Sequence, residues 1–332
     1  MTNKKRTALV TGAGGFIGHH LVNRLVKDGF FVRGVDLKYP LYEKSQAHEF
    51  FVFDLRNRDS CADAVEGMED VYHLAADMGG IGYIGTQKSQ IAENNALIDT
   101  HMLRAAKMEA CTERFFFSSS ACAYPMWLQD GSKEVNLKEE MAWPAAPEPG
   151  YGMEKLFMEE MCRYANEEHK LKTFVARFHN VFGPLGTYEG GKEKAPAAIC
   201  RKVALAKHND TIEVWGDGKQ RRSYTYIDDC IEGVRRLVES VYHCPLNIGS
   251  DVAITTDELV ELVADIAGKN VQVSHNITAP TGVLSRNSDN EKIKSLLGWE
   301  PAYGPGAGLI PTYDWINKQV TLPRNTKVRV AG

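Results

Sequence analysis

Tyr151 and Lys155 lie four residues apart at the start of a predicted helix, so both side chains project from the same face. A lysine ammonium beside a phenol favours the phenolate and lowers the phenol pKa from about 10. Such a phenolate can accept the proton of a hydroxyl group while hydride leaves the same carbon for a nicotinamide. The same spacing occurs in many helices as a plain surface pair, so its meaning depends on the rest of the chain.

Two more reactive side chains follow the predicted buried strand Arg114–Ser118. Ser120 can orient a substrate through its hydroxyl, and Cys122 can act as acid or base if its surroundings lower a thiol pKa of about 8.5. The loop after a central parallel strand is where such sheets bind ligands. On their own, the serines are equally an ordinary polar strand end, and most free cysteines are small core residues.

The glycine-rich segment 190–197 suits a loop that folds over a ligand, and a helix is predicted from Ala195. Lys194 in this segment is a second acid–base candidate. The alternative is a solvated charge run, and we interpret Lys192 in that way.

A glycine cluster near the amino terminus separates a predicted strand, Thr7–Thr11, from a helical run through Val26. Gly12, Gly15 and Gly18 permit a tight turn, close approach of the backbone to a pyrophosphate, and close packing of the helix. The helix amino terminus adds N–H groups and a partial positive charge for the phosphates. A strand–turn–helix corner without a ligand has a similar pattern, but the context favours a dinucleotide site.

Asp36 ends the next predicted strand, 18 residues beyond Gly18. A carboxylate there can accept hydrogen bonds from both ribose hydroxyls and repels a 2′-phosphate, which favours NAD over NADP. Arg33 and Lys38 flank Asp36 and weaken that preference.

The first 180 residues alternate short β-rich runs with helical patterns, which predicts parallel strands joined by right-handed crossovers. We expect an α/β fold: a Rossmann-type doubly wound parallel sheet with a smaller, partly interleaved C-terminal substrate domain. The expected domains are 1–180 for NAD, with a segment near 222–250 returning to it, 181–320 for the substrate, and a flexible tail at 321–332. The predicted strands are Thr7–Thr11, Phe31–Val35, Glu49–Phe53, Asp70–Leu74, Arg114–Ser118 and Thr173–Phe178, with Pro245–Gly249 as a candidate seventh. The predicted helices begin near Phe16, Arg58, Gln87, Tyr151 and Ala195, and later ones are Asp228–Glu239, Thr256–Ala267, Asn290–Leu297 and a stretch near Leu309–Lys318.

Composition excludes several other classes of protein. A net charge of −4 over 332 residues provides no cationic field for nucleic acid or an anionic membrane. No apolar stretch reaches the length of a membrane span and Met1–Arg6 leads into no signal peptide, so we expect a cytoplasmic protein. The seven scattered cysteines include no C-x-x-C pair, which indicates reduced thiols rather than disulfides or a metal site.

The G-x-x-G-x-x-G spacing resembles that of the extended short-chain dehydrogenase/reductases. This resemblance implies that Ser120, Tyr151 and Lys155 act together on the substrate. It also implies that Asp54 holds the adenine. The implied cofactor contacts are Gly12, Gly15, Phe16, Ile17, Gly18, Asp36, Asp54, Tyr151 and Lys155.

Within that family the chain resembles the GDP-mannose 3,5-epimerases over about residues 6–320. The segments Ser120-Ala121-Cys122 and Glu193-Lys194-Ala195-Pro196 are the most specific to this branch. The chain departs from the plant-type pattern at Met126–Glu134 and Ala302–Pro311. The other matching segments are Ala75–Gly80, Gly183–Thr187, Arg177–Asn180, Trp215–Gly218, Gln220–Ser223, Asn247–Asp251, Arg286–Asn290 and Leu297–Trp299.

The resemblance implies conversion of GDP-D-mannose to GDP-L-galactose by transient NAD-dependent oxidation at carbon 4. The ketone acidifies the hydrogens on carbons 3 and 5, and Cys122 and Lys194 would remove and return these protons. Tyr151 and Ser120 would stabilise charge at the carbon 4 oxygen. The implied substrate contacts are Gly79, Ser120, Ala121, Cys122, Tyr151, Asn180, Glu193, Lys194, Ala195, Lys202, Gln220, Arg222 and Arg286, of which Lys202, Arg222 and Arg286 match the diphosphate contacts.

The family usually pairs into homodimers through the helices that flank the Tyr/Lys segment, here the helical runs Gln87–Ala110 and Glu154–Asn166. Arg201 and Arg221 are expected to be solvated or structural.

Two alternatives remain at this stage. The first is another NAD-dependent sugar-nucleotide epimerase, dehydratase or decarboxylase, although Ala121, Ala123 and Tyr124 offer no acid beside Cys122 for a 4,6-dehydratase. The second is a non-catalytic NAD-binding regulator, which the joint presence of Ser120 and the Tyr/Lys pair disfavours.

Overall fold

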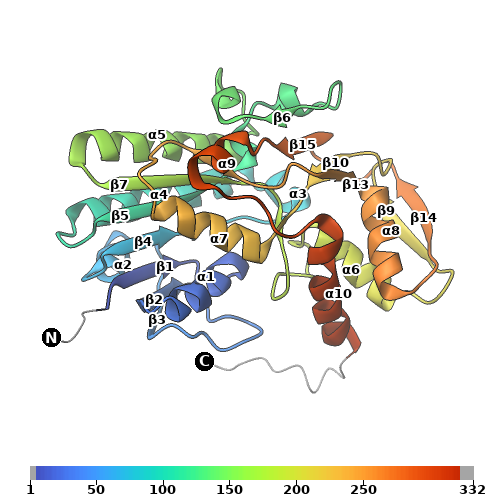
Figure 1. Ribbon diagram of the computed structural model, residues 1–332, viewed down its shortest axis with the longest axis horizontal. Helices are drawn as coiled ribbons and strands as arrows, with labels where there is room; N and C mark the ends of the chain where they lie inside the picture. The colour runs from blue at the N-terminus through green and yellow to red at the C-terminus, as the bar shows by residue number, and fades with distance from the viewer. Residues whose placement is uncertain (1–4, 322–332) are drawn as a thin grey trace.

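The computed structural model describes residues 5–321 (Figure 1). Its larger part is built on a parallel seven-stranded sheet in the order β3-β2-β1-β4-β5-β7-β12. The order reverses between β1 and β4, as in doubly wound folds, so the predicted Rossmann-type sheet and its seventh strand are confirmed. The strands are β1 (Thr7–Thr11), β2 (Phe31–Asp36), β3 (Glu49–Val52), β4 (Asp70–His73), β5 (Arg114–Ser120), β7 (Lys172–Phe178) and β12 (Leu246–Ile248).

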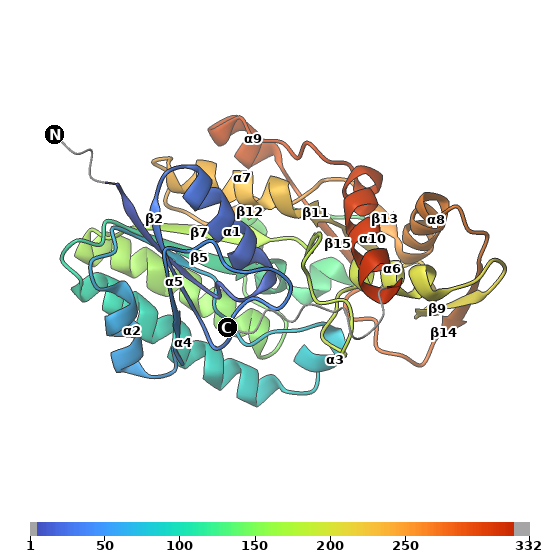
Figure 2. The ribbon, with the colours of Figure 1, turned by 90° about the horizontal axis from the view of Figure 1, so that it is seen from below.

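Helices cover both faces of this sheet (Figure 2). The run Phe115-Phe116-Phe117 in β5 shows why, because successive side chains of a strand point to opposite faces. Phe116 packs in the core beneath α1 and α7, whereas Phe115 and Phe117 pack in the core against α2, α4 and α5. These helices are α1 (Phe16–Lys27), α2 (Arg58–Val65), α4 (Lys88–Met108), α5 (Tyr151–His169) and α7 (Ile227–Val238).

A smaller part stands beyond the carboxyl ends of the large sheet (Figure 1). It contains a four-stranded sheet, β13-β10-β15-β6, and the parallel pair β14-β9. The chain returns from it through α7 and β12 to the large sheet, so the two parts interleave. Its elements are β6 (Asn136–Leu137), α6 (Ala195–Leu205), β9 (Thr211–Trp215), β10 (Arg221–Ser223), β13 (Ala253–Thr255), α8 (Thr256–Ala267), β14 (Gln272–Asn276), β15 (Ser285–Ser288) and α10 (Pro305–Thr321). Short connecting elements are α3 (Ile81–Ile84), β8 (Val181–Phe182), β11 (Thr225–Tyr226), α9 (Glu291–Leu297) and three single 3₁₀ turns, η1 (Ala121–Ala123), η2 (Met126–Gln129) and η3 (Glu139–Ala142).

The last helix differs from its prediction, since α10 begins at Pro305 rather than near Leu309. Proline is well suited to a first helical turn, where its missing N–H has no partner to lose. Packing requires glycine at position 308, because a Cβ there would lie 2.8 Å from Phe182 Cζ and 2.9 Å from Tyr226 Cδ2. The predicted tail, 321–332, falls outside the described residues apart from Thr321.

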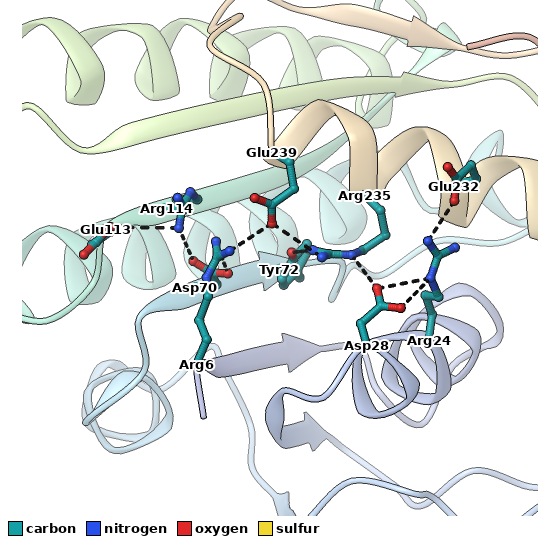
Figure 3. A network of polar contacts seen from close by, with 10 residues as sticks. All are labelled: Arg6, Arg24, Asp28, Asp70, Tyr72, Glu113, Arg114, Glu232, Arg235 and Glu239. Carbon is teal, nitrogen blue, oxygen red and sulfur yellow. Dashed lines mark hydrogen bonds and ion pairs between the residues drawn. The ribbon is translucent and has the colours of Figure 1, made fainter. Parts of the chain in front are cut away.

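Charged residues cross-link the elements at the amino ends of the strands (Figure 3). Arg6 pairs with Asp70 at 2.6 Å, and Arg235 of α7 pairs with Asp28 at 3.1 Å and contacts the Tyr72 hydroxyl. Asp70 and Arg235 are buried, and buried charges stabilise a fold only when they are paired, whereas Arg6 and Asp28 are partly exposed. The network ties α1 and α7 to β4, and it lies at the edge of the sheet opposite the candidate site.

Candidate active site

The glycine loop after β1 has the geometry that a pyrophosphate site requires. Gly12 adopts φ +70°, and a Cβ on Gly18 would lie 2.1 Å from the Gly12 carbonyl oxygen. Gly14, which the sequence analysis did not single out, is equally constrained: its Cβ would lie 2.1 Å from the Lys38 carbonyl oxygen. The Gly14 N–H donates to Asp36 Oδ2 at 3.0 Å. The hydrogen bond between Gly14 and Asp36 therefore fixes the position of the acidic side chain relative to the glycine loop.

A cavity of about 700 Å³ opens at the carboxyl ends of β1, β4 and β5. Its size and its backbone cradle fit NAD. Asp36 is partly buried, and burial raises its pKa despite the hydrogen bonds from Gly14 and Lys38. Asp54 pairs with Arg56 at 2.6 Å, which lowers the Asp54 pKa. The predicted site residues that line the cavity are Gly12, Gly15, Phe16, Ile17, Gly18, Asp36, Asp54, Gly79, Ser120, Tyr151 and Lys194.

Tyr151 and Lys155 lie on the first turns of α5 and are both buried. Lys155 Nζ is 5.7 Å from the centre of the Tyr151 ring and 4.5 Å from that of Phe117. Burial raises the pKa of Tyr151, and the lowering by Lys155 and Ser120 does not offset it. Lys155 thus lowers this pKa as expected, but burial outweighs it, and spacing along a helix does not reveal burial.

Cys122 is buried in η1, and its backbone N–H donates to the Ser120 hydroxyl at 3.2 Å. Burial raises the pKa of the thiol, although Arg286 partly opposes this. Arg286 Nη1 lies 3.2 Å from the Cys122 sulfur, and its Nε donates to Gln129 Oε1 at 2.6 Å. The lowered thiol pKa that the sequence analysis requires for acid–base chemistry is therefore not found, because burial outweighs the effect of Arg286.

Lys194 precedes the first residue of α6 and lines the cavity. Burial lowers its pKa, with Cys122 opposing and Arg286 adding to the effect. Within residues 5–321 its ammonium makes no hydrogen bond or ion pair. Burial thus raises the pKa of the Cys122 thiol and lowers that of the Lys194 ammonium, because it disfavours the charged form of each group.

Of the other predicted substrate residues, Arg286 is a buried cation of the smaller part and Arg222 is a partly buried one. Burial, with a contribution from Arg286, lowers the pKa of Arg222 to about 10. Arg222 donates to the Arg221 carbonyl at 2.8 Å and to that of Val283. Arg286 also pairs with Glu148 at 3.7 Å, whereas no carboxylate within residues 5–321 pairs with Arg222. Guanidinium groups suit a site for phosphates.

The remaining predicted contacts bond within the protein. Lys202 donates to the Glu213 carbonyl at 2.6 Å, Gln220 to the Trp215 carbonyl at 2.6 Å, and Asn180 to the Ser223 carbonyl at 2.9 Å. Glu193 pairs with Arg201 at 3.5 Å. None of these four lines the cavity, nor do Ala121, Cys122, Ala195, Arg222 and Arg286.

Lys192 is exposed, as expected for a solvated charge, and it also lines the cavity. Its Nζ lies 3.7 Å from the centre of the Tyr83 ring and 3.9 Å from Asp77. Its carbonyl accepts from the Gly80 N–H at 3.2 Å. The glycine-rich loop is thereby joined to α3 across the mouth of the cavity.

Comparison with known proteins assigns the class. Residues 8–249 match the NAD dependent epimerase/dehydratase family. The chain belongs to this family, and NAD is its cofactor. A solved UDP-glucose 4-epimerase from Thermotoga maritima has the same fold, with a TM-score of 0.84 and 25% identity over 95% of this chain and 99% of that one. Within residues 5–321 no helix is both long enough and apolar enough to cross a membrane.

Two curated relatives narrow the assignment within the family. "GDP-mannose 3,5-epimerase 1" of Oryza sativa subsp. japonica is 43% identical over 99% of this chain and 86% of its own length. "GDP-mannose 3,5-epimerase" of Arabidopsis thaliana is 45% identical over 94% and 82%. By contrast, "UDP-glucuronic acid decarboxylase 1" of Xenopus tropicalis is 26% identical. These relatives place the chain in the GDP-mannose 3,5-epimerase branch.

Proposed function

We propose that this isomerase converts GDP-D-mannose to GDP-L-galactose. The observation that supports this best is that Lys194, Tyr151 and Ser120 line one cavity, with Cys122 hydrogen-bonded to Ser120. Inversion of two carbons next to a ketone requires a proton donor and a proton acceptor in addition to the hydride chemistry. A simple 4-epimerase needs neither group.

The residues of the chain divide the chemistry between them. NAD, when bound, accepts a hydride and later returns it. Tyr151 exchanges a proton with the carbon 4 oxygen, and the Lys155 ammonium stabilises the negative charge that this creates. Lys194 and Cys122 remove and return the protons at carbons 3 and 5, one acting as base and the other as acid. Each exchanges its proton with solvent between the two inversions, so that both groups recover their starting states. Arg222 and Arg286 bind the diphosphate and keep the ketone from leaving.

Product analysis tests this function. Purified protein without added NAD is incubated with GDP-mannose, UDP-glucose and UDP-glucuronic acid in parallel, and the products are identified by proton NMR. We expect a galactose-configured product from GDP-mannose alone. Turnover of a UDP-sugar with none of GDP-mannose would favour the alternative, a 4-epimerase or decarboxylase of the same family.

The assembly we propose is a homodimer formed through α4 and α5. Leu97 of α4 and Met153, Phe157 and Tyr164 of α5 are exposed apolar side chains. Met153 and Phe157 are a helical turn apart, so they share a face and form an apolar stripe. Sedimentation of the protein at micromolar concentration should show a dimer, and a monomer would contradict the proposal.

We further propose a cytoplasmic location and a division into a cofactor domain, 1–180 with 222–250, and a substrate domain, 181–320. All seven cysteines are unpaired, which fits a reducing compartment. Cell fractionation tests the location, and limited proteolysis near residue 180 tests the division.

A further inference from the structure

A buried chain of hydrogen bonds leads from Lys155 away from the cavity. Lys155 Nζ donates to Asp99 Oδ2 at 3.0 Å, and the exposed fractions of the two side chains are 1% and 0%. The other Asp99 oxygen lies 2.9 Å from His73 Nε2, and His73 Nδ1 lies 2.8 Å from the Thr11 hydroxyl. The chain therefore links α5, α4, β4 and β1, and it ends beside the glycine loop.

The hydrogen bonds at Thr11 fix the direction of the whole chain. Its hydroxyl oxygen accepts the backbone N–H groups of Leu74 and Ala75, each at 3.1 Å. With both lone pairs used, the hydroxyl proton points to His73 Nδ1, which must accept it. His73 is therefore neutral and donates through Nε2 to Asp99, whose carboxylate remains charged.

A second buried carboxyl, Glu154, lies 3.7 Å from Lys155. Burial and then Asp99 raise the pKa of Glu154 to about 9, against the pull of Lys155. Burial alone would raise the pKa of Asp99 as well, but Lys155 and His73 outweigh it and hold that pKa below its usual range. One carboxyl is thus ionised and the other protonated, so the cluster around Lys155 is neutral.

The groups that face Lys155 come from three elements. Asp99 comes from α4, and the Phe117 ring comes from β5. The remaining groups come from α5, namely Tyr151, Glu154 and the buried thiol of Cys162. Among the described residues, Asp99 is the one fully ionised counterion of the ammonium. A buried lysine without a counterion tends to lose its proton.

We propose that Asp99 is the positioning residue that keeps Lys155 charged and aimed at Tyr151, with His73 and Thr11 holding Asp99 and Glu154 standing as a reserve counterion. This role rests on the proposed function, since it concerns the Tyr151–Lys155 pair. If Asp99 loses its charge, Glu154 ionises and replaces it. The replacement is imperfect, because Glu154 becomes protonated again as the pH falls.

The test uses the isosteric variants Asp99→Asn and Glu154→Gln and the double variant, all in the full chain. We expect Asp99→Asn to lose about tenfold in kcat at about pH 8 and to gain an acid limb that the parent lacks. Glu154→Gln should stay within about threefold of the parent. The double variant should lose at least about a thousandfold, far more than the two single losses combined. Additive losses, or an Asp99→Asn pH profile that coincides with that of the parent, would overturn the proposal.

Two controls separate the role of Asp99 from a general effect on folding. Asp229→Asn removes a buried carboxylate that, within residues 5–321, binds only the backbone N–H groups of Ala302 and Tyr303, and its pH profile should match the parent's. His73→Leu removes the donor to Asp99 while leaving both carboxyls, and it should lower kcat by less than Asp99→Asn does, with KM unchanged. An unchanged kcat for His73→Leu would contradict the role of the relay formed by Asp99, His73 and Thr11.

A measurement without sugar distinguishes failure of this proposal from failure of the proposed function. NADH binding is followed by its fluorescence in the same variants. The double variant should bind NADH at least about tenfold more weakly than the two single effects predict. If the double variant binds NADH this weakly while GDP-mannose is not turned over, the role of Asp99 is supported and the proposed function is wrong. If GDP-mannose is turned over but the effects on NADH affinity are additive, the role of Asp99 is wrong and the proposed function is unaffected.

Discussion

Gly152, the second residue of α5, lies where the helix that carries Tyr151 contacts the turn that carries Cys122. A Cβ at Gly152 would lie 2.2 Å from the Cys122 carbonyl oxygen and 2.9 Å from its carbon. Real Cβ contacts are not found below 3.0 Å, so in Gly152→Ala either α5 or η1 must move by roughly 1 Å. Tyr151 would move with α5, and Cys122 with η1. A misplacement of about 1 Å at a reacting centre costs about 100-fold in rate, equivalent to about 2.7 kcal/mol.

The assay compares Gly152→Ala with Gly304→Ala, whose added Cβ meets no atom within 4 Å and whose φ is not in the left-handed region. Activity toward GDP-mannose should fall about 100-fold in the first variant and stay at the parent level in the second. NADH binding should survive in both, because the glycine loop is untouched. Unfolding of Gly152→Ala should show about 1–3 kcal/mol of destabilisation. Retention of more than a third of the parent kcat would refute the argument that these two backbones are in fixed contact.

Lys194→Met should lower kcat about 1000-fold while leaving NADH binding intact, as measured by steady-state kinetics and fluorescence. Arg222→Ala should raise KM for GDP-mannose at least about tenfold, whereas Lys202→Ala, whose ammonium already bonds to a backbone carbonyl, should change it less; equal effects would contradict the placement of the diphosphate. The raised pKa of Glu154 stabilises the fold fully below the ordinary carboxyl pKa of about 4.3, and this stabilisation is lost as the pH rises through about 9. Urea unfolding should therefore show Glu154→Gln gaining stability relative to the parent between about pH 5 and pH 9, and a constant difference would contradict the shift. Phe157→Asp should convert the dimer to a monomer in sedimentation, and an unchanged dimer would place the interface elsewhere.

Local signals explain how much of the fold could be predicted from the sequence. Strands such as Thr7–Thr11 and the turn at Gly12 depend on neighbours within a few residues, and the structure confirms both. The last helix begins at Pro305 rather than near Leu309, and Gly308 within it packs closely against Phe182 and Tyr226, which are distant in the sequence.

The residues of the candidate site that belong to short sequence motifs could be predicted, but contacts between residues far apart in the sequence could not. Arg286 meets Cys122 across 164 positions of sequence, and Asp99 meets Lys155 across 56, so no spacing pattern reveals either contact. The single sequence signal for Asp99 is an acidic residue among the apolar positions of a long helix, next to Ile98 and close to Met102. The raised pKa of Tyr151 could not be predicted from the sequence for the same reason, since burial is a property of the folded chain.

The central claim is that protons leave and return at carbons 3 and 5 of a ketone formed within this site. The most direct test is incubation of the purified protein with GDP-mannose in deuterated water, without added NAD, followed by mass spectrometry and proton NMR. We expect deuterium at carbons 3 and 5 of a galactose-configured product. Turnover of GDP-mannose with no deuterium at carbons 3 and 5 would contradict this claim.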